Sequence, residues 1–193
     1  MAKKESTFGS MLITLLIVTS IAALALGGVY NLTKEPIAAA KRAKLEKALS
    51  NVLPAFDSIQ ETKFVPENEK DTLYYYKATN AGEYVGTAVK TFTNTGFSGK
   101  IWIMVGIRPD MQIHNTAILE HKETPGLGDK MDQKKHPWAG QFIEKNPTMG
   151  YKLKVTKDGG DVDAITAATI TSRAFCDAVK RAYDNLKTEG GNK

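Results

Sequence analysis

Four hydroxyl side chains fall within seven positions of the segment 166–172, and the residues between them are mostly small. Apolar side chains at helical spacing follow, and they predict an amphipathic helix over 173–186. Ser172 is the predicted N-cap of this helix, because its hydroxyl can accept hydrogen bonds from first-turn N–H groups. Unpaired N–H groups and the helix dipole favour an anion there, so the segment is a candidate phosphate site. An ordinary capped helix start has the same composition, and residue types alone favour that simpler interpretation.

A second segment, residues 121–130 (HKETPGLGDK), combines turn-forming residues with two glycines. Pro125 and Gly126 fit the two central positions of a type II turn, the second of which needs a positive φ. Gly128 permits a further close approach of the backbone. Such a loop can place peptide planes and the apolar side chain of Leu127 against a flat ligand. A purely structural turn after a strand is the alternative interpretation.

The composition excludes several classes of protein. The chain has 193 residues with 26 Lys and Arg against 21 Asp and Glu, a net charge of +5 that is spread along the sequence. Nucleic-acid binding is not expected, because it usually requires a concentrated basic surface. The single cysteine, Cys176, precludes an intramolecular disulfide. No metal site and no catalytic residue are predicted from any motif.

The N-terminal part predicts a membrane anchor. Residues 11–30 are nearly all apolar, and a helix of about 20 residues spans the hydrocarbon core of a bilayer. We assign residues 1–10 to a cytoplasmic N-terminus and 11–32 to a transmembrane helix, with Lys3 and Lys4 favouring this orientation. A cleaved signal peptide is the alternative, but its apolar core would be shorter. The remaining chain is expected on the outer side of the cytoplasmic membrane.

The body of the chain predicts an α+β fold, with an antiparallel sheet flanked by helices. Residues 33–55 are predicted to form a stalk helix with Pro36 in its first turn, and 56–193 the domain. The almost wholly apolar segment 101–107 predicts a strand buried on both faces. The other expected elements are strands at 72–78, 84–92, 112–119 and 151–155, a loop at 94–100 and a short helix at 138–143.

The pairing of HKETPGLGDK at 121–130 with DAITAAT at 163–169, behind one apolar N-terminal segment, resembles the FMN-binding domain of electron-transport subunits. Members of this family include the G subunit of the Rnf ion-translocating complex and the C subunit (NqrC) of the sodium-pumping NADH:quinone reductase. The resemblance covers nearly the whole chain. The length of the chain is closer to that of the Rnf G subunit than to that of the longer NqrC. The family motif is Asp, two variable residues, Ser or Thr, usually Gly, then Ala-Thr, and its final Thr carries FMN.

On this sequence the resemblance implies a covalent FMN phosphoester on Thr169. The other cofactor-binding residues that it implies are Asp163, Thr166, Ala167 and Ala168, with Thr171 and Ser172 as supporting hydroxyls. The loop Glu123, Thr124, Pro125, Gly126, Leu127 and Gly128 is implied to pack on the isoalloxazine ring. The one departure from the motif is Ala167, which stands where glycine is usual.

The resemblance implies an electron-carrier subunit of an ion-translocating oxidoreductase, with no complete activity of its own. Its implied partners are the other membrane subunits of an Rnf-type complex, a flavin transferase of the ApbE type and membrane lipid. An NqrC-like subunit of a quinone reductase is one alternative. A membrane-tethered scaffolding module without flavin and a sensory flavoprotein domain are the others. The pumped ion, the electron donor and the electron acceptor do not follow from the sequence.

Overall fold

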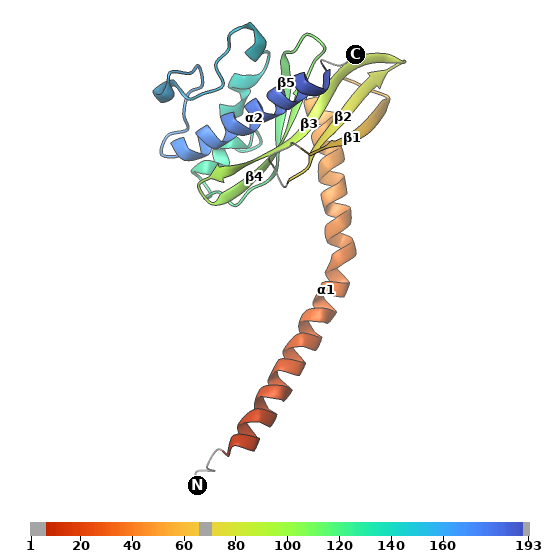
Figure 1. Ribbon diagram of the computed structural model, residues 1–193, viewed down its shortest axis with the longest axis vertical. Coiled ribbons are helices and arrows are strands. Elements are labelled where there is room, and N and C mark those ends of the chain that lie inside the picture. The colour runs from red at the N-terminus through yellow and green to blue at the C-terminus, as the bar shows by residue number, and fades with distance from the viewer. Residues whose placement is uncertain (1–6, 66–70, 191–193) are drawn as a thin grey trace. The chain divides into compact units, whose positions relative to one another are not determined.

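The computed structural model describes residues 7–65 and 71–190, apart from the side chains of 187–190 (Figure 1). Lys3, Lys4 and the C-terminal residues 191–193 lie outside the described residues. The chain forms two compact units, residues 1–44 and 45–193. Each unit is described by itself below.

The first element is a single long helix, α1 (Phe8–Val52), of 45 residues. Its apolar N-terminal part is long and apolar enough to cross a membrane. The prediction that Pro36 begins a separate helix is wrong, because α1 continues through it. An interior proline removes one backbone hydrogen bond, but the Ala, Leu and Lys residues that follow are strong helix formers.

The domain is built on a five-stranded antiparallel sheet in which each strand pairs with the next along the chain. The strands are β1 (Ser58–Phe64), β2 (Leu73–Asn80), β3 (Glu83–Gly96), β4 (Gly99–Ile107) and β5 (Ile113–Glu120). The α+β expectation is confirmed. The edge strand β1 was not predicted, because its sequence SIQETKF is polar and none of its residues is fully buried.

Both faces of the sheet are covered. On one face, Val89, Ile103 and Val105 pack in a core with α2 (Thr169–Gly190). On the other face, the alternate positions Ala88 and Met104 pack against the last turns of α1, which supply a smaller core. Strand β4 is therefore buried on both sides, as its apolar sequence predicts.

Two predictions about the connections need correction. Residues 94–100 do not form an open loop, because β3 and β4 continue into a tight hairpin in which Gly96 pairs with Gly99. Residues 151–155 do not form a strand, and Val155 makes only an isolated parallel bridge to Val162. The short helix expected near 138–143 is a 3₁₀ helix, and the described part of the chain contains four such helices: η1 (Gly128–Met131), η2 (Pro137–Phe142), η3 (Pro147–Met149) and η4 (Thr156–Asp158).

Candidate flavin site

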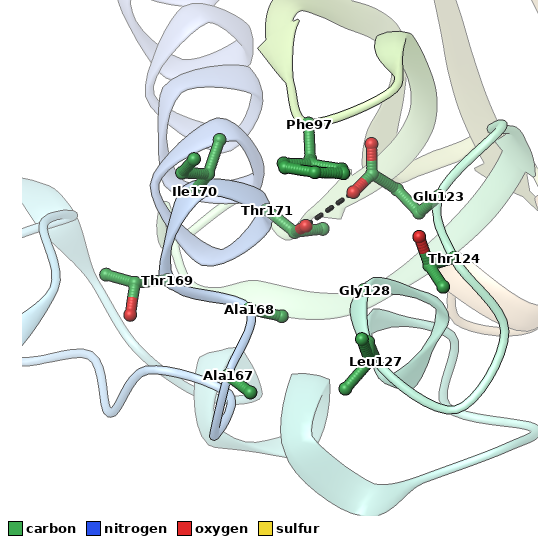
Figure 2. Close-up of a pocket in the computed structure, with 10 residues that line it drawn as sticks. All are labelled: Phe97, Glu123, Thr124, Leu127, Gly128, Ala167, Ala168, Thr169, Ile170 and Thr171. Carbon is green, nitrogen blue, oxygen red and sulfur yellow. Dashed lines mark hydrogen bonds between the residues drawn. The ribbon is translucent and has the colours of Figure 1, made fainter.

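A cavity of about 320 Å³ opens where three segments of the domain meet (Figure 2). These segments are the tip of the β3–β4 hairpin, the loop after β5 and the start of α2. Its lining residues are Phe97, Glu123, Thr124, Leu127, Gly128, Ala167, Ala168, Thr169, Ile170 and Thr171. The two segments that carry the sequence motifs, far apart in the chain, thus share one cavity. A volume of this size lies within the range of small-molecule sites.

Helix α2 begins at Thr169, three residues before the predicted N-cap. The prediction for Ser172 is therefore wrong, because Ser172 lies inside the helix and is fully buried. Its Oγ donates to the carbonyl oxygen of Ala168 at 3.0 Å and accepts from the N–H of Ile165 at 2.9 Å. The side chain thus ties the preceding turn to the helix. The first backbone hydrogen bond of α2 is made by the N–H of Ser172, which donates to the carbonyl oxygen of Ala168 at 3.0 Å.

This arrangement leaves first-turn N–H groups of α2 beside the cavity. The N–H groups at the start of an α-helix have no partner within the helix, and here they belong to Thr169, Ile170 and Thr171. All three residues line the cavity. The start of α2 is therefore suited to an anion through both its N–H groups and its dipole.

The turn before α2 holds Ala167 in a backbone conformation that favours glycine. The N–H of Ala168 donates to the carbonyl oxygen of Ile165 at 3.0 Å, which closes a turn over residues 165–168. Ala167 has a φ of +62°, in the left-handed region. A Cβ atom makes this conformation unfavourable, whereas glycine adopts it freely. Glycine would therefore occupy position 167 without strain, whereas Ala167 occupies it with strain.

The loop after β5 contains the turn that its sequence predicts. The N–H of Leu127 donates to the carbonyl oxygen of Thr124 at 3.2 Å, and Gly126 has a φ of +75°. These features agree with a type II turn that has Pro125 and Gly126 at its centre. The side chain of Leu127 remains 41% exposed and lines the cavity.

A buried polar pair lies beneath the cavity. Thr171 Oγ1 donates to Glu123 Oε2 at 2.5 Å, and both residues are buried (Figure 2). The second carboxylate oxygen, Oε1, accepts from the N–H of Ser98 at 2.9 Å. A Cβ atom on Gly128 would lie 2.6 Å from Glu123 Oε2 and 2.7 Å from Thr171 Oγ1. Gly128 is therefore needed for close packing against this pair.

Two lining residues were missed at the level of the sequence. Phe97, at the hairpin tip, is 68% exposed, and Ile170, in the first turn of α2, is 48% exposed. The only available signal for the first was an aromatic residue between Gly96 and Gly99, and a single exposed aromatic residue is common on protein surfaces. Ile170 gave no signal of its own.

Several predicted site residues do not line the cavity. Asp163 and Thr166 are exposed, Pro125 and Gly126 belong to the outer part of the loop, and Ser172 is internal. The backbone of Asp163 is nevertheless held in place. Its carbonyl oxygen accepts from Trp138 Nε1 at 2.6 Å, and its N–H donates to Gln141 Oε1 at 2.8 Å.

Further polar contacts hold the loop after β5. His121 Nδ1 accepts from the N–H of Glu123 at 3.1 Å, and burial, together with the nearby charge of Lys135, lowers the pKa of His121. Asp129 is buried and forms an ion pair with Lys135 at 2.9 Å. The hydrogen bond from Lys135 lowers the pKa of the Asp129 carboxyl. These contacts brace the base of the loop.

The family described as FMN-binding domain matches residues 96–184 of the chain. This range contains all ten lining residues of the cavity. The match includes β4, β5 and the start of α2, the elements that place both motifs.

The chain is also similar to proteins named as the G subunit of an ion-translocating oxidoreductase complex. It is 37% identical to the protein of that name from Aliivibrio fischeri (strain MJ11) over 180 residues, 88% of this chain and 86% of that protein. It is 35% identical to the one from Vibrio atlanticus (strain LGP32) over 162 residues, 79% of this chain and 78% of that protein. For Shewanella amazonensis the identity is 34% over 161 residues, with 77% and 74% covered. The chain belongs to this family of G subunits of ion-translocating oxidoreductase complexes.

Proposed function

We propose that this protein carries FMN as a covalent phosphoester on Thr169 and relays electrons within an ion-translocating oxidoreductase complex of the Rnf type. The observation that carries this proposal is the shared cavity of the 121–130 and 163–169 motifs, with Thr169 at the first position of α2. The names of the relatives supply the setting in a complex.

The residues present fit a flavin. The side chains of Phe97, Leu127 and Ile170 offer apolar surface on three different segments, which suits a flat aromatic ring system. The first turn of α2 offers N–H groups to a phosphate. Thr169 is partly exposed, so a transferase of the ApbE type can reach its hydroxyl.

In this proposal the flavin supplies the redox chemistry and the protein supplies position and electrostatics. Thr169 is an attachment point and transfers no electron. The start of α2 stabilises the remaining negative charge of the phosphodiester. The loop at Thr124–Gly128 excludes water from one side of the ring through Leu127.

We further propose that the apolar part of α1 anchors the protein in the cytoplasmic membrane, with the FMN domain on the outer side. Its length and composition support a single crossing. Lys3 and Lys4 before the apolar segment support a cytoplasmic N-terminus. Protease treatment of intact spheroplasts tests this orientation, and a domain that resists cleavage until the cells are lysed contradicts it.

Covalent attachment is tested by co-expressing the full chain with an ApbE-type flavin transferase. A denaturing gel should show flavin fluorescence on the protein band, and intact mass should rise by one FMN less water. Thr169→Ala should lose both signals. Thr62→Ala is the control, because Thr62 is exposed on β1 and lies outside both motifs and the cavity lining, and it should keep both signals. A wild-type protein without flavin, or a Thr169→Ala protein that retains it, refutes the proposal.

A further inference from the structure

Glu123 joins the three segments that form the cavity. It belongs to the loop after β5, accepts from the N–H of Ser98 in the hairpin tip and accepts from Thr171 Oγ1 in α2. Ser98 follows Phe97, and Thr171 lies two residues after Thr169. One carboxylate therefore links the positions of the exposed aromatic side chain and the proposed attachment residue.

The environment of this carboxylate is unusual for a charged group. Glu123 is only 4% exposed, and no ion pair joins it to a lysine or arginine in the part of the chain that the structure describes. Buried charges in proteins are usually paired with an opposite charge. Here two hydrogen bonds, from the N–H of Ser98 and from Thr171 Oγ1, take the place of a cation. The carboxyl group of Glu123 is thereby held at the wall of the cavity.

We propose that Glu123 is a positioning residue that holds the hairpin tip and the start of α2 together, and that its buried charge makes the bound flavin harder to reduce. This proposal rests on the proposed function. Reduction adds negative charge to the flavin, and a fixed carboxylate at the wall of a low-dielectric cavity opposes it. The same residue thus sets the shape of the cavity and lowers the midpoint potential of its cofactor.

The test compares Glu123→Gln with the wild type, both as full chains loaded with FMN in detergent. Glutamine keeps the size of the side chain and an oxygen that can accept from the Ser98 N–H, but it removes the charge. We expect the equilibrium to shift toward reduced flavin by about tenfold, a rise in midpoint potential of about 30 mV for a two-electron couple. Glu83→Gln is the matched control, since it removes one exposed charge at the opposite end of β3.

A second measurement tests the positioning role without flavin, in chains expressed in the absence of the transferase. Glu123→Ala should increase amide hydrogen exchange at Ser98 and in the first turn of α2. Thr171→Val, which removes one of the two hydrogen bonds, should have a smaller effect, and Thr171→Ser should restore protection. Protection that is unchanged in Glu123→Ala overturns the positioning role.

The two measurements separate the possible failures. A Glu123→Gln protein that binds flavin with the potential of the Glu83→Gln control overturns the electrostatic role. A wild-type protein without covalent flavin refutes the proposed function instead, while hydrogen exchange still decides the role of Glu123 in the fold.

Discussion

Ala167→Gly should stabilise the domain, because it removes backbone strain from the turn that leads into α2. The left-handed conformation costs a residue with a Cβ atom about 1–2 kcal/mol. Glycine adds unfolded-state entropy that offsets about 0.4–1 kcal/mol of this gain. Ala167 is exposed, so its methyl group contributes little burial. The net expectation is a stabilisation of about 0.5–1 kcal/mol, or about 1–4 °C in Tm for a domain of this size.

The assay is thermal unfolding of the flavin-free full chain in detergent, followed by circular dichroism. Ala81→Gly provides a matched control, because Ala81 has a φ of +50° in the β2–β3 hairpin, far from the cavity in sequence. It should stabilise the domain by a similar amount. Ala164→Gly, at a position without a positive φ, should be neutral or destabilising. If Ala81→Gly raises Tm and Ala167→Gly does not, the positive φ of Ala167 does not strain the turn.

Ala167→Gly also tests whether the methyl group of Ala167 hinders flavin attachment, in addition to straining the backbone. Since glycine keeps the φ of the turn, the path of the backbone into Thr169 should not change. Ala167→Gly should therefore carry the same amount of covalent flavin as the wild type after complete modification. A higher final stoichiometry would show that the methyl group itself hinders attachment.

Three further changes probe the frame of the cavity, each by thermal unfolding. Gly128→Ala should destabilise the domain by about 1–3 kcal/mol, because its Cβ atom would collide with the Glu123–Thr171 pair; an unchanged Tm would contradict that packing. Ser172→Ala should lower the free energy of unfolding by about 1–2 kcal/mol, since it leaves the buried N–H of Ile165 unpaired. Ser172→Thr, which keeps a hydroxyl, is the comparison. His121→Asn keeps an acceptor for the Glu123 N–H but removes a group whose pKa is lowered on folding. The wild type should therefore lose stability as the pH falls below about 6.5. The variant should lose less stability over the same pH range.

The large elements could be predicted from the sequence because their patterns are strong. The apolar segment 101–107 lies within β4, and the amphipathic helix predicted over 173–186 lies within α2 (Thr169–Gly190), which is longer at both ends. Strand β1 could not be predicted, because an edge strand buries little and its polar sequence carries no clear period. The start of α2 was misplaced for a different reason. Ser172 has the composition of an N-cap, but its hydroxyl bonds backward to the turn, which only the fold reveals.

The cavity shows a further limit of motif-based prediction. The two motifs identify residues that lie together, but they contain neither Phe97 nor Ile170, which come from elements with ordinary local sequences. They also do not distinguish backbone requirements from ligand contacts. Gly126 is explained by its φ and Gly128 by the space it leaves, whereas Leu127 between them faces the cavity.

The four hydroxyl residues near the start of α2 differ in their burial. Ser172 and Thr171 are buried and bind protein groups, so neither is free for a phosphate. Thr166 is exposed but lies outside the cavity lining, and Thr169 alone among the four is both partly exposed and at the cavity. In the proposed attachment, the choice of Thr169 therefore follows from its exposure and its position at the cavity. Because the other three hydroxyls are buried or lie outside the cavity lining, Thr169→Ala should leave no alternative attachment site, and peptide mass mapping should find no FMN on Thr166, Thr171 or Ser172.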